Sequence, residues 1–365
     1  MIKVCQVVSD TNIGGAGRYL LNYLKYFDRE NYKVSVVIPQ GSKLLEFIAV
    51  HQDVDIFEIP YMADISYDKR CVEILTELFK KEQFDILHTH ASLSARIAGR
   101  KAKIKTVIAT RHCIEPKGNV PISWIKSFLN NRLCDYYIAV SDAVYENLKQ
   151  CGIKRKKIKT VYNGVEPLKP LNEGQIALAK EKHSIGEGTV FGIFARLEEV
   201  KGHRYFIEAA KEYLSRGNKG IFLIVGDGSL KAELEELAED TPQIKFTGYV
   251  KNTEELLNIT DVNVIASSSE AMSLAILEAM SLGKPTVATN VGGNPQLVIP
   301  EKNGLLTEYA DAHSMELAFE KLSHDKELYA KCSQNSKSIF YSEFTAEVMV
   351  KNLQKLYWEV SNGKQ

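Results

Sequence analysis

The sequence predicts an α/β protein built from two doubly wound, Rossmann-like domains. Its 365 residues are too many for one ordinary hydrophobic core. Short β-branched runs alternate with helical patterns, and such alternation predicts parallel sheets with helices on both faces. The pattern stops at a segment that contains Pro167 and Pro170 and then restarts. We therefore expect a first domain over residues 1–165 and a second domain from residue 166 onward.

Six buried strands are predicted in the first domain, and a seventh closes it. The six are Ile2–Val8, Lys33–Ile38, Val54–Ile59, Phe84–His88, Thr106–Thr110 and Tyr136–Val140. Helical patterns cover Tyr19–Phe27, Cys71–Glu82, Leu93–Lys101 and Asp142–Cys151. The last strand lies within residues 157–167 and ends in a turn at Asn163 and Gly164, which marks the junction between the domains.

A glycine-rich loop, Asn12–Arg18, follows the first strand. It lacks the third small residue of a dinucleotide-binding fingerprint, because Leu20 occupies that position. Gly14 and Gly15 still allow the backbone to approach a pyrophosphate closely before the helix begins. A tight turn without any ligand is the alternative interpretation.

The second domain begins with the strands Val190–Ala195, Gly220–Val225 and Ile244–Thr247. Arg196 ends the first of these, and Lys201 follows five residues later, beside Gly202 and a helix. A forked guanidinium and a compact ammonium that converge on one point suit a diphosphate. Two solvated surface cations are the alternative.

The stretch from Asp261 to Val298 carries the strongest signal. It predicts a strand at Val262–Ala266, a helix at Ser273–Ser281 and a strand at Thr286–Thr289. Glu270 lies in the loop before the helix, and Glu278 lies within the helix. Carboxylates accept hydrogen bonds from vicinal hydroxyls, and a helix start attracts anions, so the stretch indicates joint recognition of a sugar and a nucleotide.

This stretch resembles the signature of retaining glycosyltransferases of the GT-B fold, family 4 (glycosyl transferases group 1), of the bacterial polysaccharide and cell-envelope type. The resemblance rests on two glutamates separated by seven residues and on the run EAMSLGKPTVATNVGG. It implies two Rossmann-like domains that face each other across a cleft. It also implies that the second domain ends near residue 340 and that a last helix, 341–365, returns to the first domain.

The resemblance assigns roles to residues at matching positions. Glu270 contacts the donor sugar, Glu278 contacts the ribose, and Arg196 and Lys201 hold the pyrophosphate and stabilise the leaving group. His90, the second histidine of an H-x-H, hydrogen-bonds the donor sugar near the reacting carbon. The remaining donor contacts are Gly14, Gly15, Gly248, Tyr249, Val250, Met272, Ser273 and Leu274. Gly15, Arg18, His112 and Asn163 lie on the acceptor side, although His112 is almost as well explained as a polar loop residue.

The implied reaction is a metal-independent transfer of a sugar, which we expect to come from a UDP-sugar, to a saccharide or lipid-linked acceptor. No cofactor, no bound metal and no nucleic-acid partner are expected. A nucleotide-sugar-binding subunit with a degenerate site and a GT-B sugar-nucleotide epimerase are the alternatives. Two departures from the family pattern are Gln296, where a glutamate is usual, and Ala271, Met272 and Ser273, where glycine and an aromatic residue or proline are usual.

Charge and apolar patterning bear on location. No apolar run is long enough to span a membrane, no signal peptide is evident, and the six cysteines show no metal-site spacing, so we expect a cytoplasmic protein. Residues 1–165 carry 25 Lys and Arg against 17 Asp and Glu, which suits either an anionic inner membrane face or a solubilising surface. The apolar stripe of Pro121–Arg132 either touches membrane or packs on the sheet, and we favour packing.

Overall fold

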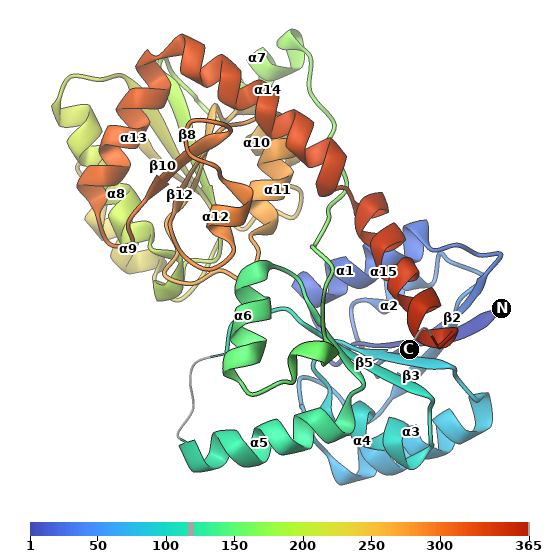
Figure 1. Ribbon diagram of the computed structural model, residues 1–365. Coiled ribbons are helices and arrows are strands. Elements are labelled where there is room, and N and C mark those ends of the chain that lie inside the picture. Colours follow the sequence, from blue (N-terminus) through green and yellow to red (C-terminus); the bar gives the residue numbers. More distant parts are fainter. Residues whose placement is uncertain (116–119, 364–365) are drawn as a thin grey trace. The chain divides into compact units, whose positions relative to one another are not determined.

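The computed structural model describes residues 1–115 and 120–363. It divides into two compact units, the first formed by Met1–Val165 with Ala346–Gln365 and the second by Glu166–Thr345 (Figure 1). Each unit is a parallel sheet covered by helices, and the last helix of the chain belongs to the first unit. The predicted fold class of two Rossmann-like domains is confirmed, and the last helix belongs to the first of them as expected.

The first unit contains a seven-stranded parallel sheet in the order β3-β2-β1-β4-β5-β6-β7. Its strands are β1 Ile2–Val7, β2 Tyr32–Pro39, β3 Asp55–Ile59, β4 Ile86–Thr89, β5 Thr106–Arg111, β6 Tyr136–Ala139 and β7 Ile158–Thr160. Its first helices are α1 Gly15–Tyr26, α2 Leu45–Ile48, α3 Lys69–Glu82, α4 Leu93–Lys101, α5 Val120–Leu133 and α6 Asp142–Gln150. The strand order reverses between β1 and β4, which creates a crevice at the carboxyl ends of these strands.

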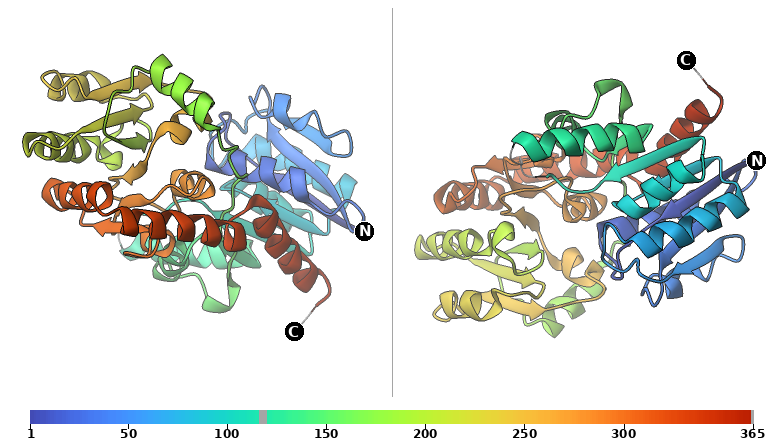
Figure 2. Two further views of the ribbon diagram at one scale, coloured as in Figure 1. Left: turned by 90° about the horizontal axis from the view of Figure 1, so that it is seen from above. Right: turned by 90° about the horizontal axis from the view of Figure 1, so that it is seen from below.

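The C-terminal helix α15, Ala346–Ser361, completes the core of this unit. Met349, Val350, Leu353 and Tyr357 share one buried apolar cluster with residues of α1 and of the central strands. Figure 1 shows α15 beside α1, and Figure 2 shows both chain termini at this unit. Because its apolar face is buried in the core, α15 is an integral part of the first unit.

The second unit contains a six-stranded parallel sheet in the order β10-β9-β8-β11-β12-β13. Its strands are β8 Thr189–Phe194, β9 Gly220–Val225, β10 Ile244–Gly248, β11 Val262–Ile265, β12 Thr286–Thr289 and β13 Gly304–Thr307. Its helices are α7 Glu173–Lys182, α8 His203–Ser215, α9 Lys231–Leu237, α10 Glu254–Ile259, α11 Leu274–Ser281, α12 Asn294–Leu297, α13 Ala312–His324 and α14 Lys326–Glu343. Here the order reverses between β8 and β11.

Several details differ from the sequence-based expectation. The last helix begins at Ala346 rather than at residue 341, because α14 continues to Glu343. Helix α1 begins at Gly15 rather than Tyr19, because Gly14 adopts the extended conformation of an N-cap and the small residues that follow are already helical. The strand β13 and the four-residue helices α2 and α12 were not predicted. They are too short to show a period in the sequence.

Candidate functional site

A cavity of about 290 Å³ lies at the carboxyl ends of β8 and β11 in the second unit. These are the two strands between which the sheet order reverses, the usual ligand position in a doubly wound sheet. Six of the predicted site residues line it: Arg196, Lys201, Glu270, Met272, Ser273 and Leu274. The folded chain therefore brings both predicted cations and one predicted carboxylate to one place.

Lys201 and Glu270 form an ion pair across this cavity. The Lys201 Nζ lies 2.6 Å from Glu270 Oε1, and their side chains are 22% and 11% exposed. The Ser267 hydroxyl donates to the same carboxylate oxygen at 2.7 Å. One oxygen of Glu270 thus takes two donors from the protein. The ammonium has three N–H groups, so it can serve Glu270 and a ligand oxygen together.

Tight backbone contacts hold the loops that carry this pair. Gly202 follows Lys201 with φ of +67°, and a Cβ there would collide with the carbonyl oxygen of Ala266. The Ser268 N–H donates to the carbonyl oxygen of Val200 at 2.9 Å. On the far side, Gly293 N–H donates to the carbonyl oxygen of Glu270 at 2.9 Å. The glycines of both loops are thus required by the close approach of backbones, which fixes the position of Glu270.

Arg196 and the start of α11 supply further groups for an anion. Arg196 is exposed, lines the cavity and makes no side-chain hydrogen bond to a described residue. Ser273 is the N-cap of α11 and gives no side-chain cap, so the first-turn N–H groups keep no intrahelical acceptor. Cationic side chains and a helix start together suit a phosphate.

The other predicted donor contacts of the second unit lie outside the cavity lining. Glu278 lies further along α11, and Gly248, Tyr249 and Val250 follow β10. The Gly248 carbonyl oxygen accepts from the Gly226 N–H at 3.0 Å, whereas the Tyr249 side chain is exposed. Their predicted roles with the ribose and the base remain predictions.

His203, the first residue of α8, was missed from the sequence. Its side chain is buried, and neither ring nitrogen has a hydrogen-bond partner among the described residues. Burial, reinforced by the charge of Lys201, lowers the pKa of His203 to about 4. The imidazole of His203, two residues after Lys201, is therefore neutral at neutral pH. The glycine between them in KGH is the only feature of the sequence that marks the position.

A second cavity, of about 610 Å³, lies in the first unit. Gly15, His90 and His112 line it, together with Arg96 and Arg111, which the sequence analysis did not single out. Arg111 is ion-paired with Glu115, and Glu115 also accepts from Lys126 of α5 at 2.8 Å. Gly14, Arg18 and Asn163 do not line this cavity. Arg18 is exposed, whereas Asn163 is buried at the junction.

Three histidines stack at the carboxyl ends of β4 and β5. The ring centroids of His88 and His90 lie 4.5 Å apart, and those of His90 and His112 lie 5.1 Å apart. His90 is almost fully buried although it lines the cavity, and its two nitrogens contact Gln6 Oε1 at 3.1 Å and His112 Nε2 at 2.9 Å. His112 is the most exposed of the three.

These histidines are held neutral by burial. Burial, reinforced by His112, lowers the pKa of His88 to about 3, and burial alone lowers the pKa of His112 to about 4. For His90, burial and then its two histidine neighbours lower the pKa well below its ordinary value. At neutral pH all three imidazoles can therefore exchange hydrogen bonds without carrying charge.

Two family models match the chain, one after the other. Residues 13–168 match "Glycosyltransferase Family 4", and residues 175–339 match "Glycosyl transferases group 1". The chain belongs to the family 4 glycosyltransferases. The family 4 enzyme described here therefore acts on a nucleotide sugar, which accords with the cations and carboxylate that line the cavity of its second unit.

Two curated relatives match most of the chain. The UDP-Gal:alpha-D-GlcNAc-diphosphoundecaprenol alpha-1,3-galactosyltransferase of Escherichia coli is 27% identical, and the match covers 100% of this chain and 98% of the relative. The N-acetyl-alpha-D-glucosaminyl L-malate synthase of Bacillus anthracis is 26% identical, over 82% of each protein.

Solved structures share the fold at lower identity. Anabaena HepE in complex with UDP superposes with a TM-score of 0.86 at 20% identity, and the match covers 98% of this chain and 100% of HepE. A glycosyltransferase from Rickettsia africae gives a TM-score of 0.84 at 21% identity, over 98% of each chain. These similarities establish the GT-B fold of the family 4 enzyme.

Proposed function

We propose that this glycosyltransferase moves a sugar from a UDP-sugar to a saccharide carried on a lipid diphosphate, with retention of configuration and without a metal. The arrangement that carries this proposal is the Lys201–Glu270 pair, which lies with Arg196 around one cavity at the switch point of the second sheet. The cations suit the diphosphate of a donor, and the carboxylate suits the hydroxyls of its sugar.

The choice of uridine rests on relatives. The E. coli relative uses UDP-galactose, and HepE binds UDP. The residues between Glu270 and α11 are Ala271, Met272 and Ser273 rather than the usual family residues, so the sugar itself is best sought with a panel of donors.

The proposed reaction exchanges one bond at the anomeric carbon for another. The bond from C1 to the diphosphate oxygen breaks, and a bond from C1 to the acceptor hydroxyl oxygen forms on the same face. The hydroxyl proton passes to the departing diphosphate, so the products are the glycosylated acceptor and UDP. Arg196, Lys201 and the start of α11 meet the negative charge that develops on the diphosphate, and such preorganised donors contribute roughly several kcal/mol each.

Metal independence is supported by the chemistry of the cavity lining. A magnesium-dependent site offers carboxylate oxygens to the ion. Among the described residues that line this cavity, Glu270 is the one carboxylate, and it is already paired with Lys201 and Ser267. Two cations in the same lining supply the charge that a metal would otherwise bring.

A lipid-linked acceptor and contact with the inner face of the cytoplasmic membrane are supported by α5. Its Ile125, Phe128 and Leu129 are 57%, 58% and 47% exposed, so the expectation that this stripe packs on the sheet is wrong for these residues. The side chains of Ile122 and Trp124 lie outside the described part of the chain. In the described part, no helix combines the length and the apolar character needed to cross a membrane.

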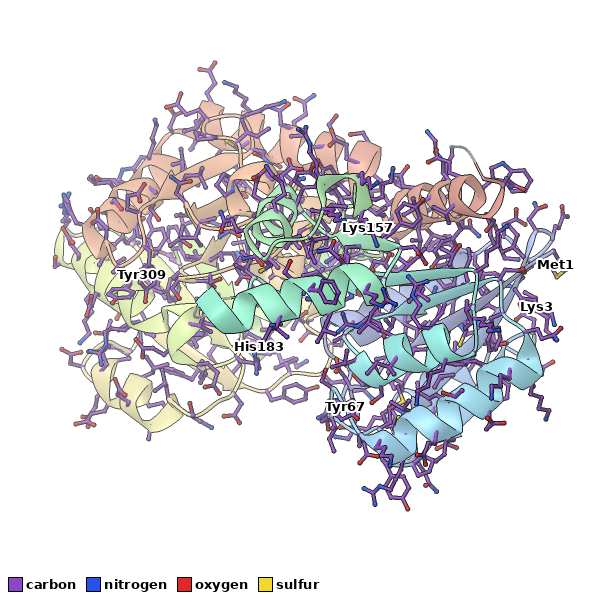
Figure 3. All side chains as sticks on the ribbon, turned by 60° about the horizontal axis from the view of Figure 1, so that its bottom comes forward. Met1, Lys3, Tyr67, Lys157, His183 and Tyr309 are labelled. Carbon is purple, nitrogen blue, oxygen red and sulfur yellow. The ribbon has the colours of Figure 1, made fainter. Side chains whose placement is uncertain are left out.

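Basic residues border the exposed stripe. Arg132, Lys154, Arg155 and Lys156 are exposed, and a groove of about 370 Å³ between α5 and residues 152–154 contains Phe128 and two of these cations. Lys157 donates to the carbonyl oxygens of Asn131 and Cys134 at 2.5 and 2.6 Å and so caps the end of α5 (Figure 3). Apolar side chains beside cations are the pattern of an interfacial helix on anionic lipid.

Thermal shift with UDP-, GDP-, ADP- and dTDP-sugars tests the donor. A ligand that binds only the folded protein raises the melting temperature, so we expect a rise with one UDP-sugar that persists in chelator. Glu278→Ala should abolish that rise if Glu278 contacts the ribose. Binding without transfer to any acceptor would instead favour a nucleotide-sugar-binding subunit, and release of free sugar and UDP would favour an epimerase-like enzyme.

Sedimentation with phosphatidylglycerol vesicles tests the membrane surface. We expect the wild type to sediment at low salt, and Ile125→Ser with Phe128→Ser to remain in the supernatant. Leu178→Ser is the control, since Leu178 of α7 in the other unit is also an exposed apolar residue, at 68%. Equal sedimentation of all three proteins would contradict the proposed contact.

A further inference from the structure

A buried hydrogen-bond network connects the last helix of the chain to the histidine stack. Tyr357 of α15 contacts His88 and Gln6, and Gln6 contacts His90. Gln6 and Tyr357 are separated by 351 positions in the sequence and are both buried. The reaction proposed above gives no role to either residue.

The partners of Gln6 and Tyr357 determine where the protons of the first imidazole lie. The Gln6 Nε2 donates to the Tyr357 hydroxyl at 2.8 Å, so the tyrosine proton is directed to its other neighbour, His88 Nδ1, at 2.5 Å. His88 must then carry its own proton on Nε2. That nitrogen lies 2.6 Å from the Thr110 hydroxyl oxygen, which accepts.

The same amide determines the protons of the other two rings. With its nitrogen turned to Tyr357, Gln6 presents only the acceptor Oε1 to His90, so His90 carries its proton on Nε2. His90 Nδ1 is then an acceptor, and it faces His112 Nε2 at 2.9 Å. His112 therefore carries its proton on Nε2 and presents a bare lone pair on Nδ1.

We infer that Tyr357 is a positioning residue for the glycosyl transfer: through Gln6 and His90 it sets the tautomer of His112, the more exposed of the two imidazoles that line the cavity of the first unit. A lone pair on His112 Nδ1 accepts a hydrogen bond from a substrate hydroxyl, whereas the other tautomer would offer an N–H to it. The part of this inference that concerns catalysis rests on the proposed transfer. The part that concerns the tautomers does not.

The ring of Tyr357 also packs in the core, so the test must separate the hydroxyl from the ring. Tyr357→Phe keeps the ring and removes the proton that His88 receives and the acceptor that orients Gln6. Tyr32→Phe is the matched control, because the Tyr32 hydroxyl donates at 2.9 Å to the Gln354 carbonyl oxygen of the same helix and its ring contacts that of Tyr357. Tyr357→Phe removes two hydrogen bonds of α15 and Tyr32→Phe removes one, and only the first change reaches the histidines.

Nitrogen-15 NMR spectra of the histidine rings report their tautomers. These tautomers would not change if Tyr357 only stabilised the fold. In the wild type we expect His112 to hold its proton on Nε2. In Tyr357→Phe we expect a mixture of tautomers for His90 and His112, together with a loss in kcat/KM of about 10- to 100-fold. Tyr32→Phe should keep the wild-type tautomers and kcat/KM.

A second variant protects the test against a folding defect. Gln6→Leu removes the same relay from the other side, and the double variant should lose little more than either single variant, since both act through one path. Wild-type tautomers in Tyr357→Phe would overturn the inference, as would equal losses of activity in Tyr357→Phe and Tyr32→Phe. If the wild type transfers no sugar, the proposed function fails while the spectra still decide the tautomers.

Discussion

The ammonium of Lys201 lies 2.6 Å from a carboxylate oxygen of Glu270, two residues that the sequence places in separate loops. The sequence assigned one to the diphosphate and the other to the sugar. Their pairing means that the free enzyme already holds the two groups at a fixed spacing. A donor would bind to this preorganised pair, and the lysine need not be drawn in from solvent.

Replacement of Lys201 should reduce turnover far more than stability. Lys201→Ala removes a charge that faces the leaving group and leaves Glu270 with Ser267 alone, so we expect kcat to fall by roughly 10² or more. Steady-state release of UDP measures this. Lys219→Ala is the control, since the Lys219–Glu187 pair is 76% and 88% exposed and lies in the same unit. Near-normal turnover of Lys201→Ala would show that Lys201 does not stabilise the leaving group.

The loop that carries Lys201 should not tolerate a side chain at Gly202. A Cβ there combines a left-handed φ of +67° with a collision against the Ala266 carbonyl oxygen, so Gly202→Ala should displace Lys201 and abolish most activity. Gly217→Ala separates the two effects, because Gly217 has φ of +85° with open space around it. It should cost about 1 kcal/mol of stability and leave kcat unchanged. Equal kcat in both variants would contradict the argument.

Stability should fall as the solution is acidified from about pH 6.5 toward pH 4. His112 and His203 have folded pKa values of about 4, below the ordinary value of 6.5. Between about pH 4 and pH 6.5, these histidines are protonated in the unfolded chain and remain neutral in the folded chain. Each histidine therefore contributes stability above pH 6.5 that is lost at up to about 1.4 kcal/mol per pH unit on acidification.

Urea unfolding at several pH values checks this dependence. His203→Phe should flatten the slope, since it removes one such group. A slope that His203→Phe does not change would show that this imidazole does not contribute.

An ion-pair cluster lies between α8 and α13, and the free energy of unfolding should depend strongly on its one arginine, Arg216. Arg216 lies 2.9 Å from Glu212 and 3.3 Å from Glu316, whose side chain is fully buried. Arg216→Met should cost about 3–5 kcal/mol, since it leaves a buried carboxylate without its cation.

Two comparisons test the predicted effect of Arg216→Met on stability. The loss of unfolding free energy in Arg216→Met should shrink as pH falls. Burial raises the pKa of Glu316, so its carboxylate is protonated more readily and then no longer carries an unpaired charge. Arg204→Met, which breaks the exposed pair of Arg204 with Glu233, should change the free energy of unfolding by less than about 1 kcal/mol. If Arg216→Met lowered the free energy of unfolding as little as Arg204→Met does, the proposed role of the buried carboxylate would be contradicted.

The fold was predictable because its strands are short apolar runs and its helices carry clear periods. The groups at strand ends were predictable for the same reason, and Arg196, Lys201 and Glu270 do meet at one cavity. The histidine stack was not predictable. His90 lines the cavity of the first unit, but its hydrogen-bond partners are a glutamine of β1 and the histidine that follows β5, and contacts between distant segments leave no local pattern.

Two further failures have similar causes. Gln6 is one polar residue in an apolar strand, and such a residue gives no indication of which partner satisfies it. The stripe of α5 has the spacing of a buried face, yet Ile125, Phe128 and Leu129 are exposed. Spacing shows that apolar residues share a face, but it does not show whether protein or another surface covers that face.

The most direct test of the central claim is the product formed from a UDP-sugar and a GlcNAc-diphospholipid in the presence of EDTA. We predict that a glycosylated lipid forms with the anomeric configuration of the donor, that EDTA does not reduce its yield, and that Lys201→Ala abolishes it. A product of inverted configuration, or complete loss of product in EDTA, would contradict the proposed mechanism. The absence of product with every UDP-sugar and acceptor tried would contradict the proposed substrates.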